Sequence, residues 1–165
     1  MKSRRSLIAY ALALLVVAMD QASKYWVLEV FHLPEKNHVE VTPFFDLTDI
    51  SNTGVSFGLF RADDGQEWIR WILAAFSVIV VVILAIWVRG ARRTWSAVSI
   101  GLIMGGAVGN LIDRVRFGHV TDFLDFSKLH FPWVFNVADA AINVGIAILL
   151  IETFLLPDRR KAAAV

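Results

Sequence analysis

The chain has 165 residues, 57% of them hydrophobic, and its 16 Lys and Arg against 15 Asp and Glu give a formal net charge of +1. A mean hydropathy of +0.61 excludes an ordinary soluble domain of this length and favours one membrane domain, 1–165. Cysteine is absent, which excludes disulfides and thiolate sites, and the four histidines show no metal-binding spacing, so we expect no thiolate or histidine metal site.

Four segments are apolar enough to cross a bilayer, which takes about 20 residues of helix. They are roughly 7–28, 69–88, 95–115 and 133–156. The first also resembles a secretory signal peptide, but its length and the three later spans favour an uncleaved helix. The predicted fold class is therefore an all-α membrane protein, a bundle of four transmembrane helices with a small β element.

Basic residues predict the orientation of this bundle, because Lys and Arg concentrate on the cytoplasmic side of membrane proteins. One cluster precedes the first span, a second separates spans two and three, and a third follows span four. The clusters are Lys2, Arg4 and Arg5; Arg89, Arg92 and Arg93; and Arg159, Arg160 and Lys161. Four spans place all three on one side, so both termini are expected to be cytoplasmic.

The first outward-facing connection, 29–67, is expected to form a small β-rich platform on the membrane surface. It mixes β-branched and aromatic residues with Pro and Gly, a pattern typical of short strands and turns. Its aromatic residues Phe44, Phe45, Phe57 and Phe60 are expected to reach the lipid headgroups.

Glycines mark one face of the third span. Gly101, Gly105 and Gly109 recur at every fourth position, with Gly106 beside them. Small residues at this spacing let membrane helices approach closely. The same step continued once more reaches Asp113, so this packed face is predicted to end in a carboxylate.

Four aspartates from separate parts of the sequence are predicted to lie at one depth, near the outer edge of the bilayer. Asp20 comes late in span one, Asp113 late in span three beside Asn110, and Asp139 early in span four, while Asp122 lies in the short outer connection. Ionisable groups in membrane spans are costly and by default indicate function. Residues scattered without function would have no reason to share a depth.

Each of these residues also has a structural interpretation. Asp20 and Lys24 have the i, i+4 spacing of a helical ion pair. Asp113 precedes Arg114, which would compensate its charge locally. Asp139 suits the start of a helix, where the dipole favours a negative charge.

Other polar residues have similar alternatives. Asn52 and Asn136 suit turns and helix caps. Asp49 and Asp125 are expected to be exposed loop acids without a role in the site.

Paired carboxylates are the chemistry that the sequence favours. No serine lies in a nucleophile motif and no histidine in a metal motif. Two adjacent Asp share a proton because one pKa rises, so one carboxylate can take a proton from water while the other donates to a carbonyl. Asp122 and Asp139, on either side of the short outer connection, are the predicted pair.

A proton-coupled transporter or channel that uses the same carboxylates is the alternative function. A proton relay needs polar groups at successive depths, whereas the inner halves of the spans are expected to carry almost none besides Ser and an occasional Asn. Another class of intramembrane aspartyl protease lacks support because its G-x-G-D signature is absent. A non-catalytic assembly protein would need the glycine face but not the Asp pair.

Five motifs, in order along nearly the whole chain, resemble the lipoprotein signal peptidases of bacteria, also called signal peptidase II. The motifs are "DQASK" at 20–24, "NTGVSFG" at 52–58, "GGAVGNLIDR" at 105–114, "VTDF" at 120–123 and "FNVAD" at 135–139. The resemblance implies a four-helix bundle with a β-cradle and a periplasmic helix.

The resemblance also implies an activity. It implies removal of the signal peptide from diacylglyceryl-modified prolipoproteins, just before the lipidated cysteine, by the aspartic dyad Asp122 and Asp139 without a cofactor. It further implies inhibition by globomycin and a site at the outer leaflet of the inner membrane, in a chain expected to act as a monomer without nucleic acid. The positions implied to shape the site are Asp20, Lys24, Asn52, Gly54, Gly106, Asn110, Asp113, Arg114, Asn136 and Ala138.

Overall fold

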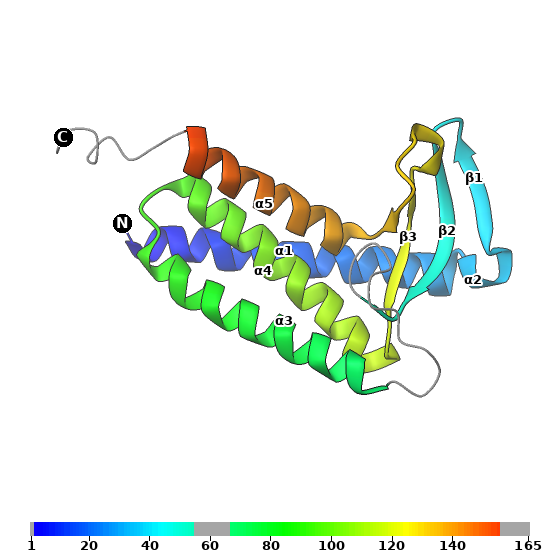
Figure 1. Ribbon diagram of the computed structural model, residues 1–165, viewed down its shortest axis with the longest axis horizontal. Coiled ribbons are helices and arrows are strands. Elements are labelled where there is room, and N and C mark those ends of the chain that lie inside the picture. The colour runs from blue at the N-terminus through cyan, green and yellow to red at the C-terminus, as the bar shows by residue number, and fades with distance from the viewer. Residues whose placement is uncertain (1, 55–66, 156–165) are drawn as a thin grey trace.

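A computed structural model describes residues 2–54 and 67–155 of the chain. Four long helices form a bundle, with a small sheet across one end (Figure 1). The helices are α1 (Lys2–Tyr25), α3 (Glu67–Trp87), α4 (Thr94–Phe117) and α5 (Val137–Leu155). Each belongs to a segment that is long and apolar enough to cross a membrane, which confirms the predicted fold class.

The helix ends follow local chemistry. α1 continues through a π-helical turn, Trp26–Val30, into the single turn of α2 (Leu33–Lys36), which is the only α-helix outside the bundle within 2–54 and 67–155. α4 ends at Gly118, whose left-handed φ of 83° suits glycine, and whose N–H donates to the Arg114 carbonyl at 3.2 Å.

The fourth span begins later than the sequence predicted. Residues 133–136 precede α5, because Val134 and Phe135 form strand β4 instead of the first helical turn. Asn136 then caps the helix, since its Oδ1 accepts the N–H of Asp139 at 2.9 Å. An apolar run followed by Asn thus belongs to a sheet edge and a cap, although its hydropathy resembles that of lipid-facing helix.

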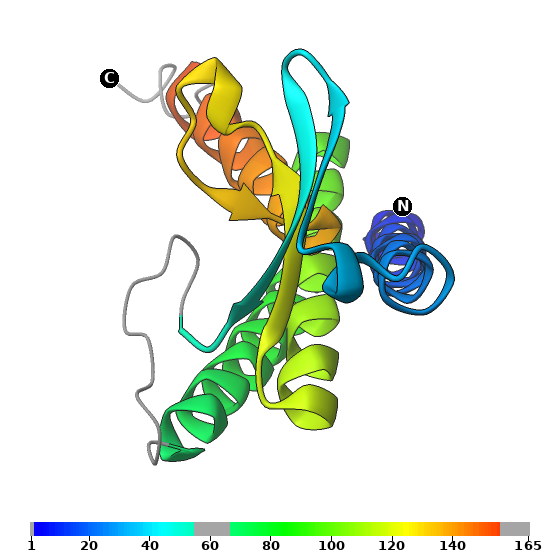
Figure 2. The same ribbon diagram turned by 90° about the vertical axis from the view of Figure 1, so that its right-hand side faces the viewer.

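The sheet has four antiparallel strands in the order β1-β2-β3-β4. The first outer connection supplies β1 (His38–Thr42) and β2 (Phe45–Asn52), as the predicted β platform requires. The short connection supplies β3 (Val120–Asp125) and β4 (Val134–Phe135), which the sequence analysis did not predict. Figure 2, which faces the sheet, shows β2 and β3 side by side in front of the helices.

The aromatic residues expected to reach the headgroups, and the last basic cluster, are only partly within the described residues. Phe44 is 53% exposed and Phe45 is half-buried. Phe57, Phe60 and the basic cluster at 159–161 lie outside the described residues.

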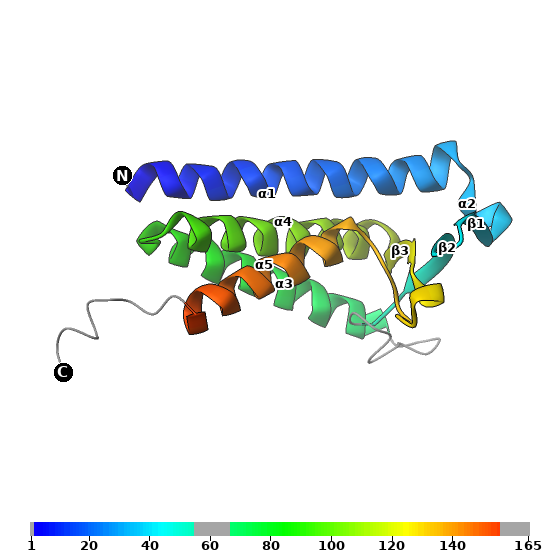
Figure 3. The same cartoon turned by 90° about the horizontal axis from the view of Figure 1, so that it is seen from above.

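α4 is the central helix, and contacts α1, α3 and α5. A Cβ added at Gly101 would lie 2.6 Å from the Ala9 carbonyl oxygen, and one at Gly105 would lie 2.6 Å from Cβ of Val16. The glycine face therefore lets α1 run in close contact beside α4, as Figure 3 shows.

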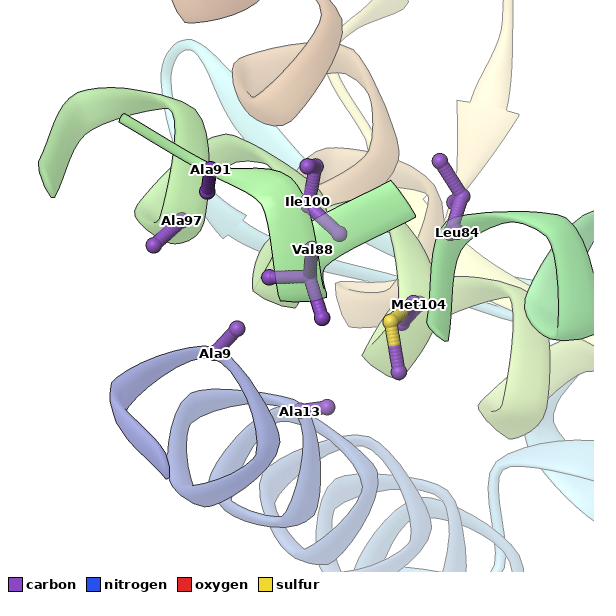
Figure 4. Packing of buried hydrophobic residues seen from close by; sticks show 8 residues of the cluster. All are labelled: Ala9, Ala13, Leu84, Val88, Ala91, Ala97, Ile100 and Met104. Atoms are coloured by element: carbon purple, nitrogen blue, oxygen red, sulfur yellow. The ribbon is translucent and has the colours of Figure 1, made fainter. Parts of the chain in front are cut away.

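A hydrophobic core fills the end of the bundle far from the sheet. Figure 4 shows its buried residues, which are Ala9, Ala13, Leu84, Val88, Ala91, Ala97, Ile100 and Met104. The small alanines allow close packing on α1, and the polar side chains gather at the opposite end of the same helices. The buried aspartates therefore gather at the sheet end of the bundle, and the candidate site lies there.

Candidate active site

The four aspartates singled out by depth lie together where α1, α4 and α5 meet the sheet. They are almost fully buried, with exposed fractions of 0% for Asp20, 1% for Asp113, 2% for Asp122 and 6% for Asp139. Buried carboxylates need partners, because an unpaired buried charge is very costly. The partners form one continuous network.

Lys24 is the cation that pairs with the aspartates of α1 and α4 in this network. Its Nζ lies 2.8 Å from an oxygen of Asp20 and 2.8 Å from an oxygen of Asp113. Gln21 adds a bridge by donating to Asp113 at 2.9 Å and to the Gly109 carbonyl at 3.3 Å. The i, i+4 ion pair predicted from the sequence is thus present, and it extends to the neighbouring helix.

Arg114 makes its hydrogen bonds to backbone and not to the Asp113 carboxylate, although its charge acts on Asp113 as its place in the sequence suggested. Its Nη2 donates to the Gly54 carbonyl at 2.9 Å, and its Nη1 to the Asn110 carbonyl at 3.5 Å. Arg114 therefore ties the end of α4 to the backbone that follows β2.

Asp20 also joins α1 to α5. Its Oδ1 accepts the N–H of Ala138 at 3.0 Å, in the first turn of α5. A Cβ added at Gly109 would lie 2.6 Å from Oδ2 of Asp20, and one at Gly106 would collide with the Ala138 carbonyl. Two glycines thus make room for this junction, and this explains why Gly106 and Ala138 fall within the site.

Asn136 connects the two predicted dyad members. Its Nδ2 donates to Oδ1 of Asp122 at 2.7 Å and to Oδ1 of Asn110 at 3.2 Å, while its Oδ1 accepts the N–H of Asp139 at 2.9 Å. Asn110 completes the link, because its Nδ2 donates to Oδ1 of Asp139 at 2.8 Å. Asn136 is therefore a helix cap, and together with Asn110 it links the two carboxyls.

Asp122 is fixed by β2 as well. Asn52, at the end of β2, donates to Oδ2 of Asp122 at 2.9 Å, and the side chain of Asn52 is itself held by the Gly54 N–H at 3.0 Å. Burial and the nearby charge of Asp139 raise the pKa of Asp122 to about 7, while the hydrogen bonds from Asn52 and Asn136 oppose that rise. Asp122 can therefore hold a proton near neutral pH.

Asp139 is the member that faces open space. Its Oδ1 is bonded to Asn110, whereas its Oδ2 accepts no hydrogen bond from residues 2–54 or 67–155. The residue borders a cavity of about 240 Å³ together with Phe131, Val134, Phe135, Ala140, Asn143 and Val144. A water or a reacting group can approach Asp139 from this cavity.

Several buried polar residues were missed or misjudged from the sequence. Gln21 bridges the site, and its position directly after Asp20 was the available signal. Asp125 was expected to be exposed, but it is buried, and it accepts hydrogen bonds from Thr48 Oγ1 at 2.7 Å and the Ser127 N–H at 2.9 Å. Asp49 is half-buried, also unlike the expectation.

The end of the bundle far from the sheet also contains a buried acid that was not predicted from the sequence. Glu152 is buried near the end of α5, where Ser96 Oγ donates to both its carboxylate oxygens at 2.9 and 2.7 Å. Arg93 Nε lies 3.8 Å away. Glu152 therefore joins α5 to the start of α4.

Metal binding can be judged at both ends of the bundle for the residues that the structure describes. No group of three or more His, Asp or Glu within the described ranges is placed to hold a metal ion. The carboxylates at the sheet end are instead occupied by Lys, Asn and backbone donors, which leaves Oδ2 of Asp139 as the open oxygen.

The sequence of the chain is similar to those of known proteins. Residues 12–155 match the sequence model of the signal peptidase (SPase) II family. A lipoprotein signal peptidase of Caulobacter vibrioides is 48% identical over 159 residues, covering 96% of this chain and 93% of that protein. Another from Beijerinckia indica is 42% identical and covers 86% of this chain and 84% of that protein.

Two solved structures, both described as bacterial membrane enzymes, share the fold. One, at 2.3 Å resolution, has a TM-score of 0.77 and 27% identity, covering 92% of this chain and 88% of that chain. The other, at 1.9 Å resolution, has a TM-score of 0.72 and 30% identity, covering 91% and 93%.

Proposed function

The chain belongs to the signal peptidase II family, and we propose that it removes the signal peptide from diacylglyceryl-modified prolipoproteins by means of an aspartic dyad. The observation that carries the proposal is the pair Asp122 and Asp139. Their buried carboxyls are linked through Asn136 and Asn110, and Asp139 borders a cavity. The match to lipoprotein signal peptidases over nearly the whole chain supports the substrate class.

The dyad holds one proton between its two carboxyls. Asp122 retains a proton near neutral pH because its pKa is raised to about 7 by burial and by Asp139. Because such a pair titrates as a unit, the proton belongs to the dyad and not to one residue. Oδ2 of Asp139 is the oxygen to which a water molecule binds.

Hydrolysis then proceeds without a covalent intermediate. The ionised carboxylate takes a proton from water as the water oxygen attacks the scissile carbonyl carbon, and the protonated carboxyl donates to the carbonyl oxygen. The carboxyl that gained the water proton next protonates the leaving nitrogen as the C–N bond breaks. The hydroxyl formed from the carbonyl oxygen returns its proton to the other carboxylate, which restores the one-proton dyad. The products are a signal peptide with a new carboxylate and a lipoprotein with a free amino group on its lipidated cysteine.

The rest of the polar network positions the dyad and the substrate. Asn52 and Asn136 fix Asp122, and Asn110 fixes Asp139, so both carboxyls are oriented before the substrate arrives. Arg114 holds the backbone at Gly54 over the site. Lys24 pairs with both Asp20 and Asp113 and so offsets one of their two negative charges next to the dyad.

The location follows from the same arrangement. The site lies at the sheet end of the bundle, where the spans meet the β platform (Figure 1). With the termini in the cytoplasm, this end faces the outer leaflet of the inner membrane, where water comes from outside and the lipid-anchored substrate comes from the bilayer.

The proposal extends to oligomeric state and inhibition. The protein acts as a monomer and is inhibited by globomycin.

A transporter or channel remains the weaker function. Glu152 does supply a buried acid at the inner end of α5. However, every residue between Asn143 and Glu152 is apolar or glycine, and so is every residue between Tyr10 and Asp20. A proton relay needs groups at successive depths, so this distribution favours a site on one side of the membrane.

The first test is cleavage of a diacylglyceryl-modified prolipoprotein by the purified protein in lipid. We expect the protein to cut the substrate just before the lipidated cysteine. Mass spectrometry measures the release of the signal peptide. Asp122→Asn and Asp139→Asn should each lower kcat/KM by about a thousandfold or more, because each removes one acid–base partner.

The exposed Glu35 in α2 provides a control away from the dyad, and Glu35→Gln should cleave at the wild-type rate. Near-normal cleavage by either folded dyad variant would contradict the proposed catalytic pair. No cleavage by the wild-type protein would contradict the proposed substrate, and proton flux in vesicles would then be measured.

A further inference from the structure

Asn143 is a polar side chain placed where a membrane protein has little reason to keep one. It lies in α5 four residues after Asp139, so it is one turn, about 6 Å, further from the start of the helix. Its side chain is exposed on the bundle surface and makes no hydrogen bond with any residue in 2–54 or 67–155. An amide that faces hydrocarbon without a partner is costly.

The same residue borders the cavity beside the dyad. Asp139 and Asn143 are the polar residues of its described lining, and the other described lining residues are apolar, with Val134, Phe135 and Val144 among them. The cavity volume of about 240 Å³ suits one large apolar side chain and a short piece of backbone. Its occupant should therefore be mainly apolar and should carry a hydrogen-bond acceptor at the depth of Asn143.

A signal peptide has this character next to its scissile bond. The bond must leave the helical conformation to be reached by water, so the carbonyl groups just before it lose their helical partners. In lipid these carbonyls find no water, and each unpaired group costs free energy. The ester carbonyls of a diacylglyceryl group lie closer to the headgroups, above the level of Asn143.

Building on the function proposed above, we infer that Asn143 is a positioning residue for the substrate backbone. Its Nδ2 donates to a peptide carbonyl of the signal-peptide segment, and an apolar side chain of that segment fills the cavity. The bond holds the extended chain against α5, with the scissile carbonyl one turn closer to the outer surface at Asp139.

The test compares Asn143→Leu with Asn143→Thr in the full chain in lipid nanodiscs. Leucine has nearly the shape of asparagine but no polar atom, whereas threonine keeps one donor. We expect Asn143→Leu to raise KM for the lipidated prolipoprotein about tenfold, with kcat changed less than about twofold, and Asn143→Thr to recover part of the loss. Ile146→Leu, on the 42% exposed Ile146 of the same helix, is the control and should leave KM unchanged.

Stability separates positioning from a structural role. If Asn143 only supported the fold, Asn143→Leu would lower the melting temperature. We expect the melting temperature to stay the same or to rise, since the change removes an unpartnered amide from lipid. A lowered melting temperature would overturn the inference.

A second substrate distinguishes a peptide carbonyl of the signal peptide from an ester carbonyl of the diacylglyceryl group as the acceptor. A prolipoprotein with ether-linked chains lacks the lipid ester carbonyls, and the Asn143→Leu penalty should persist with it. A penalty that disappears with the ether substrate would overturn the assignment to the peptide. Equal KM values for Asn143→Leu and Ile146→Leu would overturn the inference alone, whereas failure of the wild-type protein to cleave would overturn the proposed function and the inference together.

Discussion

At the scale of single residues, the surroundings of Asp122 act on its pKa in opposite directions. Burial and Asp139 raise its pKa to about 7, and the hydrogen bonds from Asn52 and Asn136 lower it. An acid with a raised pKa is protonated below that value and ionised above it. The one-proton state of the dyad is therefore lost as the pH rises through about 7.

The pH dependence of kcat/KM should show this loss. We expect activity to fall above about pH 7, by roughly tenfold per pH unit, as the dyad loses its shared proton. Asn52→Leu removes a hydrogen bond that favours the ionised carboxylate, so the alkaline limb should move to higher pH. A limb that stays in place, or moves to lower pH, would show that Asn52 does not control the titration of Asp122.

Lys24 provides a second prediction at this scale. It is buried and pairs with both Asp20 and Asp113. Lys24→Met leaves two carboxylates without a cation, and breaking a buried pair in this way costs roughly 3–5 kcal/mol of unfolding free energy. The melting temperature in detergent should therefore drop sharply.

Adding Asp113→Asn to Lys24→Met should restore part of that loss, because only one unpaired carboxylate then remains. The exposed Lys36 provides the control, and Lys36→Met should have a small effect. If Lys24→Met proved as stable as Lys36→Met, the charge balance described here would be wrong.

The depth of these residues in the bundle was predictable from the sequence, but their hydrogen-bond partners were not. The rise of a helix gave the depth of Asp20, Asp113 and Asp139, and this depends only on position along a span. It did not reveal Asn136 as the bridge, because the contact between Asn136 and Asp122 depends on the path of the chain through β3 and β4. Asp125 was misjudged for the same reason, since pairing with β2 is what buries it.

At the scale of elements, α4 organises the bundle through its small residues. Its glycines let α1 approach on one side, at Gly101 and Gly105, and α5 on another, at Gly106. This four-residue repeat was visible in the sequence, so the central position of α4 was partly predictable. The strands of the short connection were not, because β4 has only two residues and an apolar run of that kind resembles the start of a span.

The close contacts of α4 predict that one added methyl group is destabilising. A Cβ at Gly105 would lie 2.6 Å from Cβ of Val16 and 2.7 Å from the Ala13 carbonyl oxygen, so α1 must move away. Gly105→Ala should lower the unfolding free energy by about 1–3 kcal/mol, measured by thermal or chemical unfolding in detergent.

Gly90 supplies a matched control for this change, because a Cβ there meets no atom within 4 Å. Gly90→Ala should leave stability unchanged or slightly higher, since alanine restricts the unfolded chain. Equal stability of the two variants would show that α1 and α4 are less tightly packed than the structure indicates.

At the scale of the whole molecule, the two ends of the bundle differ in chemistry. The sheet and the buried carboxylates occupy one end, while α1 begins and α5 ends at the other (Figures 1 and 3). The basic residues Arg89, Arg92 and Arg93 lie in the segment that joins α3 to α4 at that second end. A membrane orientation with the sheet outside satisfies the preference of Lys and Arg for the cytoplasm.

The absence of cysteine makes this orientation directly measurable, because a single introduced thiol can be labelled without background. Glu40→Cys places the thiol on β1, where the Glu40 side chain is 73% exposed, and Gly90→Cys places it on an open surface at the opposite end. In intact cells a membrane-impermeant maleimide should label Glu40→Cys at once, and Gly90→Cys only after permeabilisation. The reverse pattern would place the carboxylate site on the cytoplasmic side, where a signal peptide that emerges on the outer surface cannot reach it. The labelling result therefore tests the orientation on which the proposed reaction depends, and it does so without a substrate.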